Sequence, residues 1–337
     1  MSSCKKRKLS GIDGAELSIA YNALLDLQQT LEDRGLGGQS DDVESADDQL
    51  EDQLERFLSL MTSILEGPKS YDLSNVTLDI LEEHLHVTQA VTLILKDEIT
   101  ERTEKSSYLG QDKLWSSSHF HDHLNWLEGL VPRTSEANVR LWIDAFFFRT
   151  SAMVPPGMRM VLNEDHTIPS TAIRPTSLTT LAGQMDYSAV VAKERAAAII
   201  LDDPLMSTIH RILPTGFFVA IGKIWELRSS VGQAVAEMYG TAKLLKQNVL
   251  RGALTNGHEW IFLILNLNPD SEGGTFKRSL MMSLSISCDP SRPQVNMGKF
   301  SADQIAGILS FWIERSFNDL EEDDWFEPLN TPMESEK

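Results

Sequence analysis

Four polar residues in the middle of the chain have the side chains and the spacing that phosphodiester hydrolysis would require. Asp186 lies near the start of one apolar segment, and Lys223 follows the apolar run Phe217–Ile221. Gln233 and Glu237 are four residues apart, so they share one face of a predicted helix. Carboxylates can bind Mg²⁺, and a lysine can stabilise the charge that develops around an attacking water. Simple solvation of these side chains is the competing interpretation.

The elements that must position these residues alternate between strands and helices. Ser135 is predicted to open a helix that carries a dense apolar face. Strands are predicted near 157–163, 184–192, 216–222, 248–255, 259–267 and 277–287, with helices at about 230–247 and 301–318. This alternation predicts a mixed α/β domain over residues 130–322. Gln233 and Glu237 are expected beside the buried stripe of the helix at 230–247.

The N-terminal third has a different pattern. Amphipathic helices are predicted at 15–33, 50–65 and 75–103, which together form a helical region over residues 15–106. The expected remainder is a disordered basic tail at 1–14, an acidic linker near 36–50, an irregular segment at 104–134 and a disordered acidic tail at 323–337. The helices could pack on the rest of the chain or bind protein partners.

Charge and composition restrict the possible partners. The chain has 337 residues and a formal net charge of −19, which argues against nucleic-acid binding over its whole surface. A local basic cleft near Lys193, Arg195, Lys223, Lys243 and Lys246 would still permit it. No apolar run is long enough for a membrane span, and no secretory signal is expected.

The expected location is the nucleus or the cytoplasm. The basic cluster Lys5, Lys6, Arg7 and Lys8 is either a nuclear import signal or an ordinary solvated tail. The chain has only two cysteines, which favours a reducing compartment over a disulfide-based fold.

Other kinds of catalytic site find little support in the sequence. His119, His121, Asp122 and His123 have metal-binding side chains, but we expect them in a solvated polar loop. The chain has neither a nucleophile elbow nor a glycine-rich phosphate-binding loop. Hydrolases with an activated serine and nucleotide-binding kinases are therefore disfavoured.

Four stretches carry a resemblance to a known family: LAGQMDYSAVVA, GFFVAIGK, VGQAVAEMYGTAK and VLRGALTNGHEWIFLIL, in that order. Together they resemble the PD-(D/E)XK nuclease-like superfamily, in particular Crinkler-type and related fungal restriction-endonuclease-like proteins. The resemblance covers about 130 to 320 and implies a restriction-endonuclease-like mixed sheet flanked by helices. It also implies a hairpin turn at Thr255-Asn256-Gly257, for which an Asn-Gly pair is well suited.

The resemblance assigns roles to individual residues. Asp186 matches the metal-binding aspartate, Lys223 the lysine of the Glu-x-Lys motif, and Gln233 a glutamine of the following helix. Ile221 stands where the glutamate of that motif is expected. Glu237 could replace it, because thirteen residues (224–236) separate it from Lys223, as in superfamily members that take this acid from the helix.

Two functions are favoured from the sequence, and a purely structural role in a larger assembly is a third possibility that the sequence neither supports nor excludes. The first is a Mg²⁺-dependent phosphodiesterase that acts on DNA or RNA, with Asp186 and Glu237 as metal ligands, Lys223 acting on the attacking water and Gln233 as a positioning group. The second is a non-catalytic interaction protein that uses a degenerate nuclease fold as a scaffold and binds protein partners through its N-terminal helices. Ile221 and the net negative charge favour the second.

Overall fold

The computed structural model describes residues 70–329, apart from 174–179, 213, 225, 270–271 and 285–294, together with residues 20–25, 54, 57, 58 and 61. The chain divides into two compact units, one of Met1–Ser70 with Arg174–Thr180 and the other of Tyr71–Ile173 with Leu181–Lys337. In the first unit, the described residues of the predicted helices 15–33 and 50–65 are helical. The predicted tail 1–14 and linker 36–50 lie outside the described residues.

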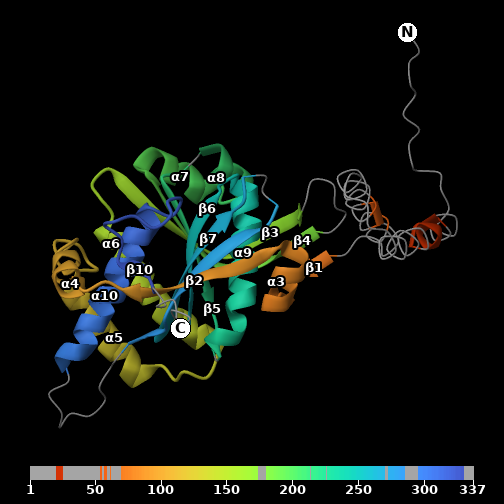
Figure 1. Cartoon of the computed structure of the whole chain (residues 1–337). Helices are drawn as coiled ribbons and strands as arrows, with labels where there is room; N and C mark the ends of the chain where they lie inside the picture. The colour runs from red at the N-terminus through yellow and green to blue at the C-terminus, as the bar shows by residue number, and fades with distance from the viewer. Residues whose placement is uncertain are drawn as a thin grey trace, which may run out of the picture. The chain divides into compact units, whose positions relative to one another are not determined.

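A mixed β-sheet organises the second unit (Figure 1). Its main path runs β1 (Ser70–Asp72), β4 (Thr180–Lys193), β5 (Gly216–Gly222), β6 (Val249–Thr255), β7 (Glu259–Leu267), β8 (Gly274–Ser279), β2 (Val87–Leu95) and β10 (Phe326–Pro328). β3 (Met158–Ala172) pairs with β4, and β9 (Met282–Ser283) pairs with β7. The pairs β5–β6 and β2–β8 are parallel, whereas β4–β5, β6–β7, β7–β8 and β2–β10 are antiparallel.

Helices cover both faces of the sheet (Figure 1). α9 (Val231–Leu245) connects the parallel strands β5 and β6 and packs on one face, with α3 (Leu78–Leu85) against it. α6 (Glu136–Met153) and α10 (Val295–Glu314) cover the other face, and α5 (Ser117–Leu130) packs on α6. In the described part of the second unit, the remaining helices are α4 (Ile99–Ser107), α7 (Glu194–Asp202), α8 (Met206–Ile212) and the 3-10 turns Leu73–Asn75 and Leu227–Ser230.

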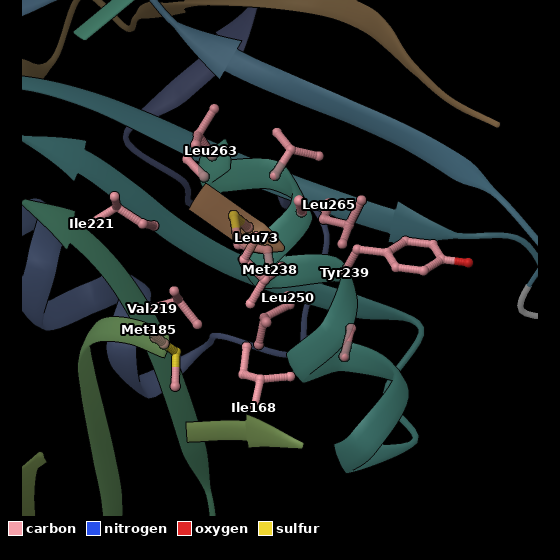
Figure 2. Packing of buried hydrophobic residues seen from close by; sticks show 14 of the residues in the cluster. Leu73, Ile168, Met185, Val219, Ile221, Met238, Tyr239, Leu250, Leu263 and Leu265 are labelled. Carbon is pink, nitrogen blue, oxygen red and sulfur yellow. The ribbon is translucent and has the colours of Figure 1, made fainter. Parts of the chain in front are cut away.

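The sequence of β5 shows why these layers form. Phe217, Val219 and Ile221 enter the apolar cluster on the α9 side, whereas Phe218 and Ala220 enter the cluster on the α6 side. A strand that is apolar at every position must be covered on both faces. Figure 2 shows Val219 and Ile221 among the buried residues of the α9 side.

Much of the predicted architecture is confirmed. The protein belongs to the α/β class, and the predicted segments 184–192, 216–222, 248–255 and 259–267 correspond to β4, β5, β6 and β7. The helix at 230–247 is α9, and Ser135 caps α6 by accepting a hydrogen bond from the backbone N–H of Asn138. The Asn-Gly turn joins β6 to β7, and Gly257 takes a φ of +80°, a value that favours glycine.

The predicted long helix at 75–103 is wrong. This segment contains α3, then strand β2, then the start of α4. Val87–Leu95 is rich in β-branched residues, and it pairs in parallel with β8, almost two hundred residues later in the chain. The unit that holds the sheet therefore begins at Tyr71, well before the predicted boundary at residue 130.

The predicted irregular segment 104–134 is also wrong, because Ser117–Leu130 forms α5. Phe120, Leu124 and Leu127 of this helix are buried against α6. The helices α7 and α8, between β4 and β5, were not predicted. The predicted strand at 277–287 is divided between β8 and β9, and its last three residues lie outside the described residues.

The predicted disordered tail at 323–337 begins too early. Asp324, Trp325 and Phe326 are buried, with exposed fractions of 0%, 4% and 2%. Phe326–Pro328 is strand β10, which pairs with β2 at the edge of the sheet. Only residues 330–337 of the predicted tail lie outside the described residues.

Candidate functional site

Asp186 lies where β4 changes the face to which its side chains point. Met185 packs in the apolar cluster on the α9 side, but Tyr187 and Ala189 pack in the cluster on the α6 side. A regular strand would place these odd-numbered positions on one face. Tyr187 pairs with Ala220, and both side chains lie on the α6 side, so Asp186 points to the α9 side. Met185 and Asp186 are therefore two successive residues on the α9 side. Such local breaks in a strand redirect side chains next to functional sites.

The carboxylate of Asp186 lies at the end of β5. Its Oδ2 accepts a hydrogen bond of 2.9 Å from the backbone N–H of Gly222. Lys223 follows directly, and its own N–H donates to the carbonyl oxygen of Thr255 at 2.9 Å, which fixes the start of the loop after β5. Burial raises the pKa of Asp186, and the positive charge of Lys223 opposes that rise. The structure thus brings together the predicted aspartate and lysine.

Glu237 approaches the same place from α9. Its side chain is completely buried, and Gln233 Nε2 donates a hydrogen bond of 2.9 Å to its Oε1. The other carboxylate oxygen, Oε2, has no hydrogen-bond partner among the described residues. The hydroxyl of Thr241 donates to the backbone carbonyl of Glu237 and is thus occupied elsewhere. The helix therefore presents a buried acid with only one of its two oxygens satisfied.

The two carboxylates influence each other. Burial raises the pKa of Glu237 well above its ordinary value of 4.5, and the nearby charge of Asp186 raises it further. The hydrogen bond from Gln233, the charge of Lys223 and the backbone N–H of Asp186 act in the opposite direction. All four predicted site residues therefore meet at one end of the sheet. The prediction placed Gln233 and Glu237 beside the buried stripe of the helix, whereas both are buried within it.

Residues of α6 that were not predicted complete the rim of the site. Arg140 places a guanidinium nitrogen 3.9 Å from Oδ1 of Asp186 and forms a closer ion pair of 2.6 Å with Asp165. Glu136, one turn earlier on the helix, raises the pKa of Asp186 through its negative charge. The i, i+4 spacing of Glu136 and Arg140 was visible in the sequence. Nothing in the local pattern linked that helix face to β4.

The two carboxylates fit a hard divalent cation. Among the described residues, no group of three or more histidines, cysteines and acids could hold a metal ion. Mg²⁺ does not require such a group, because it is usually held by one or two carboxylates, several waters and substrate phosphates. Asp186 and Glu237 supply two carboxylates, and the unpartnered Oε2 of Glu237 is an available ligand atom. Their mutual repulsion would be relieved by a cation between them.

Other candidate groups do not contribute to this site. His121 lies on α5, and its Nε2 is 3.0 Å from Oδ2 of Asp303, so it connects two helices rather than occupying a solvated loop. The lysines considered for a basic cleft are also spread out. Lys193 is seven residues along β4 from Asp186, roughly 23 Å for an extended strand. Lys246 follows the far end of α9.

Comparisons with known proteins give no independent assignment: no family model matches the chain, and no curated protein matches it. Within the described part of the chain, none of the helices has the length and apolar character needed to cross a membrane. The geometry of the site therefore carries the functional argument.

Proposed function

We propose that this protein is a PD-(D/E)XK nuclease-like phosphodiesterase that hydrolyses nucleic acid with Mg²⁺. Asp186 and Glu237 are the metal ligands in this proposal, and Lys223 and Gln233 assist them. The observation that carries it is the convergence of these four side chains, with a fully buried glutamate that lacks a partner for one oxygen. A buried carboxylate in this state is costly unless a cation or a proton satisfies it.

The order of the elements supports the proposal. The family resemblance implies two strands, a core helix and then a strand–turn–strand, with the aspartate on the first strand and the lysine at the end of the second. Here β4 and β5 are antiparallel neighbours, α9 follows, and β6 and β7 form a hairpin. This order of elements, with α7 and α8 inserted between β4 and β5, supports a restriction-endonuclease-like fold.

Each side chain of the site has its own role in the proposed hydrolysis. A bound Mg²⁺ would polarise the phosphate and lower the pKa of a coordinated water. Asp186 is held in place by the N–H of Gly222, and Glu237 by the amide of Gln233. Lys223 lies at the end of β5, where its ammonium can orient the attacking water and stabilise negative charge on the phosphate. The water oxygen would form a bond to phosphorus and release a proton to solvent, the bond to the leaving oxygen would break, and that oxygen would take up a proton from solvent.

A cleavage assay tests the proposal directly. Labelled single- and double-stranded DNA and RNA are incubated with the full-length protein and Mg²⁺ or Mn²⁺, and EDTA is the metal-free control. We expect metal-dependent cleavage that falls roughly 100-fold or more in Asp186→Asn and Glu237→Gln. The matched control is Asp323→Asn, because Asp323 is an exposed acid on another part of the unit. Undiminished cleavage in Asp186→Asn would contradict the proposal.

A specific observation favours a second function. Ile221, which replaces the expected glutamate, is fully buried in the cluster on the α9 side and contributes no ligand (Figure 2). If the loss of this acid abolishes catalysis, the domain would serve as a scaffold for protein interaction. Calorimetry separates the two functions, since a scaffold would bind neither Mg²⁺ nor Mn²⁺ at Asp186 and would cleave none of the four substrates.

A further inference from the structure

We propose that a cavity next to the candidate site is a subsite for one nucleobase of the substrate. The cavity has a volume of about 290 Å³, and we call it the strand-end cavity. Its lining residues are Arg133, Val139, Ile224, Asn256, His258, Glu259, Ser283 and Leu284. The inference rests on the proposed function, because it names the part of the substrate that would lie beside the hydrolysed phosphate.

The cavity adjoins the site through the chain itself. Ile224, one of its walls, directly follows Lys223. Asn256, another wall, directly follows Thr255, whose carbonyl oxygen accepts the N–H of Lys223. The backbone of Lys223 therefore adjoins two residues of the cavity wall. In this proposal a base in the cavity has its sugar and phosphate at the end of β5, where Lys223 begins the following loop.

The shape and the charge of the cavity select a neutral ring. Val139, Ile224 and Leu284 provide apolar surface of the kind that contacts the face of a heteroaromatic ring. The one arginine among the lining residues, Arg133, already forms an ion pair with Glu128. Glu259 adds a negative charge, so a phosphate or another anion would be disfavoured inside.

His258 brings a buried imidazole nitrogen without a partner to the wall of the cavity. Its exposed fraction is 8%, and its Nε2 has no hydrogen-bond partner among the described residues. Burial lowers the pKa of His258 to about 4, with help from the positive charge of Arg133, so the imidazole is neutral at pH 7. A neutral imidazole can accept or donate one hydrogen bond, according to its tautomer.

The imidazole is also held rigidly in place. Its ring lies against Trp142 with the two ring centroids 4.1 Å apart. The backbone N–H of His258 donates to Oδ1 of Asn256 at 3.0 Å, and its carbonyl oxygen accepts from Leu284 at 2.6 Å. The ring of His258 is thus a fixed part of the cavity wall, as in a largely pre-formed ligand pocket.

The test is an NMR titration of the full-length protein in EDTA, which observes the ring nitrogens of the eight histidines. Adenosine, cytidine, guanosine and uridine are added one at a time, and ribose 5-phosphate is the probe without a base. We expect at least one nucleoside to shift the His258 resonances in a saturable manner, whereas ribose 5-phosphate does not. The signals are assigned with His258→Phe, which keeps an aromatic ring against Trp142.

Two serine variants provide matched controls. Ser283→Phe fills the strand-end cavity from an exposed position, so we expect the nucleoside affinity to fall at least about tenfold, the equivalent of 1.4 kcal/mol. Ser207→Phe makes the same change at an exposed serine that lines a different cavity, and binding should be unchanged. The absence of any saturable His258 shift, an equal effect of ribose 5-phosphate, or full affinity in Ser283→Phe would each overturn the inference.

The design separates this inference from the proposed function. Because the titration is carried out without a divalent cation, nucleoside binding does not depend on Asp186 or Glu237. Nucleoside binding without metal-dependent cleavage would support the subsite and reject the phosphodiesterase. Metal-dependent cleavage without nucleoside binding would support the phosphodiesterase and reject the subsite.

Discussion

Glu237 and Asp324 are both completely buried carboxylates, but their surroundings are opposite. Asp324 receives hydrogen bonds at Oδ1 from the indole N–H of Trp312 at 3.0 Å and from the backbone N–H of Trp325 at 2.7 Å. Its Oδ2 lies 2.6 Å from a guanidinium nitrogen of Arg251, which is equally buried. Glu237 accepts a side-chain hydrogen bond from Gln233 at Oε1 and has the backbone N–H of Asp186 beside its carboxylate, while its Oε2 has no hydrogen-bond partner among the described residues.

This contrast distinguishes a structural acid from a candidate ligand. In the Asp324 cluster Oδ1 accepts hydrogen bonds and Oδ2 has the ion pair with Arg251 in place of an aligned hydrogen bond, so the charge of Asp324 is neutralised where it holds the segment after α10 against β6. Glu237 is incomplete in a part of the molecule that is otherwise well packed, and a second acid lies close to it. The chain surrounds Asp324 with donors and a counter-charge, whereas the open oxygen of Glu237 can be satisfied by a proton or by a bound cation.

The largest expected effect comes from breaking the Asp324 cluster. Asp324→Ala leaves the Arg251 guanidinium buried without its counter-charge, and we expect the free energy of unfolding to fall by about 3–5 kcal/mol. Urea denaturation followed by circular dichroism measures the change. Asp323→Ala, at an exposed neighbouring acid, is the control and should have little effect. A loss no greater than that of the control would show that the cluster is not structural.

The second prediction concerns the stabilisation of the protein when Mg²⁺ binds at Glu237. Mg²⁺ at 100 times its dissociation constant should raise the free energy of unfolding of the wild type by about 2.7 kcal/mol. Glu237→Gln and Asp186→Asn should not respond, because each removes one proposed ligand. Thermal and urea denaturation with and without Mg²⁺ measure the effect. Equal stabilisation of all three proteins would place the cation elsewhere.

The third prediction follows from the raised pKa of Glu237. Above its ordinary value of 4.5, the unfolded state releases this proton before the folded state does. Stability is therefore lost as the pH rises from about 4.5 through the folded-state pKa, by at most about 1.4 kcal/mol per pH unit. Glu237→Gln should remove this part of the decline. If the free energy of unfolding changed with pH in the same way in wild type and Glu237→Gln, the raised pKa could not belong to Glu237.

The smallest expected effect concerns the side-chain donor to Glu237. Gln233→Leu removes the 2.9 Å hydrogen bond, and we expect a loss of about 1 kcal/mol in the free energy of unfolding. Val235→Leu, at another buried position of α9, is the packing control. An unchanged stability in Gln233→Leu would mean that the bond contributes nothing before a cation is bound.

The sequence predicted those parts of the fold that have a strong local pattern. α9 and the β6–β7 hairpin are examples, because an apolar stripe and an Asn-Gly turn are local features. β2 was predicted as helix because a helical pattern precedes it, and its pairing with β8 is not local. The segment Asp324–Phe326 was predicted as tail because its acids looked solvated. Its order depends on Arg251, more than seventy residues away in the chain.

The sequence predicted which residues form the site, but it did not predict what surrounds them. Residue types and spacing were enough to select Asp186, Lys223, Gln233 and Glu237. Asp186 points toward α9 because the strand changes face between Met185 and Tyr187. The sequence does not reveal this change, because β4 has apolar residues on both of its faces. The complete burial of Glu237 and the approach of Arg140 depend on how whole elements pack, which no local pattern contains.

The position of β10 has a consequence for the order of events during synthesis. β2 is made early, but its partners β8 and β10 come from the last quarter of the chain. The edge of the sheet stays open on the ribosome until Phe326–Pro328 has emerged, and such unpaired strands are prone to aggregation. Chains stopped before residue 324 should therefore require chaperones more than the full chain, which release and solubility assays on a length series would measure.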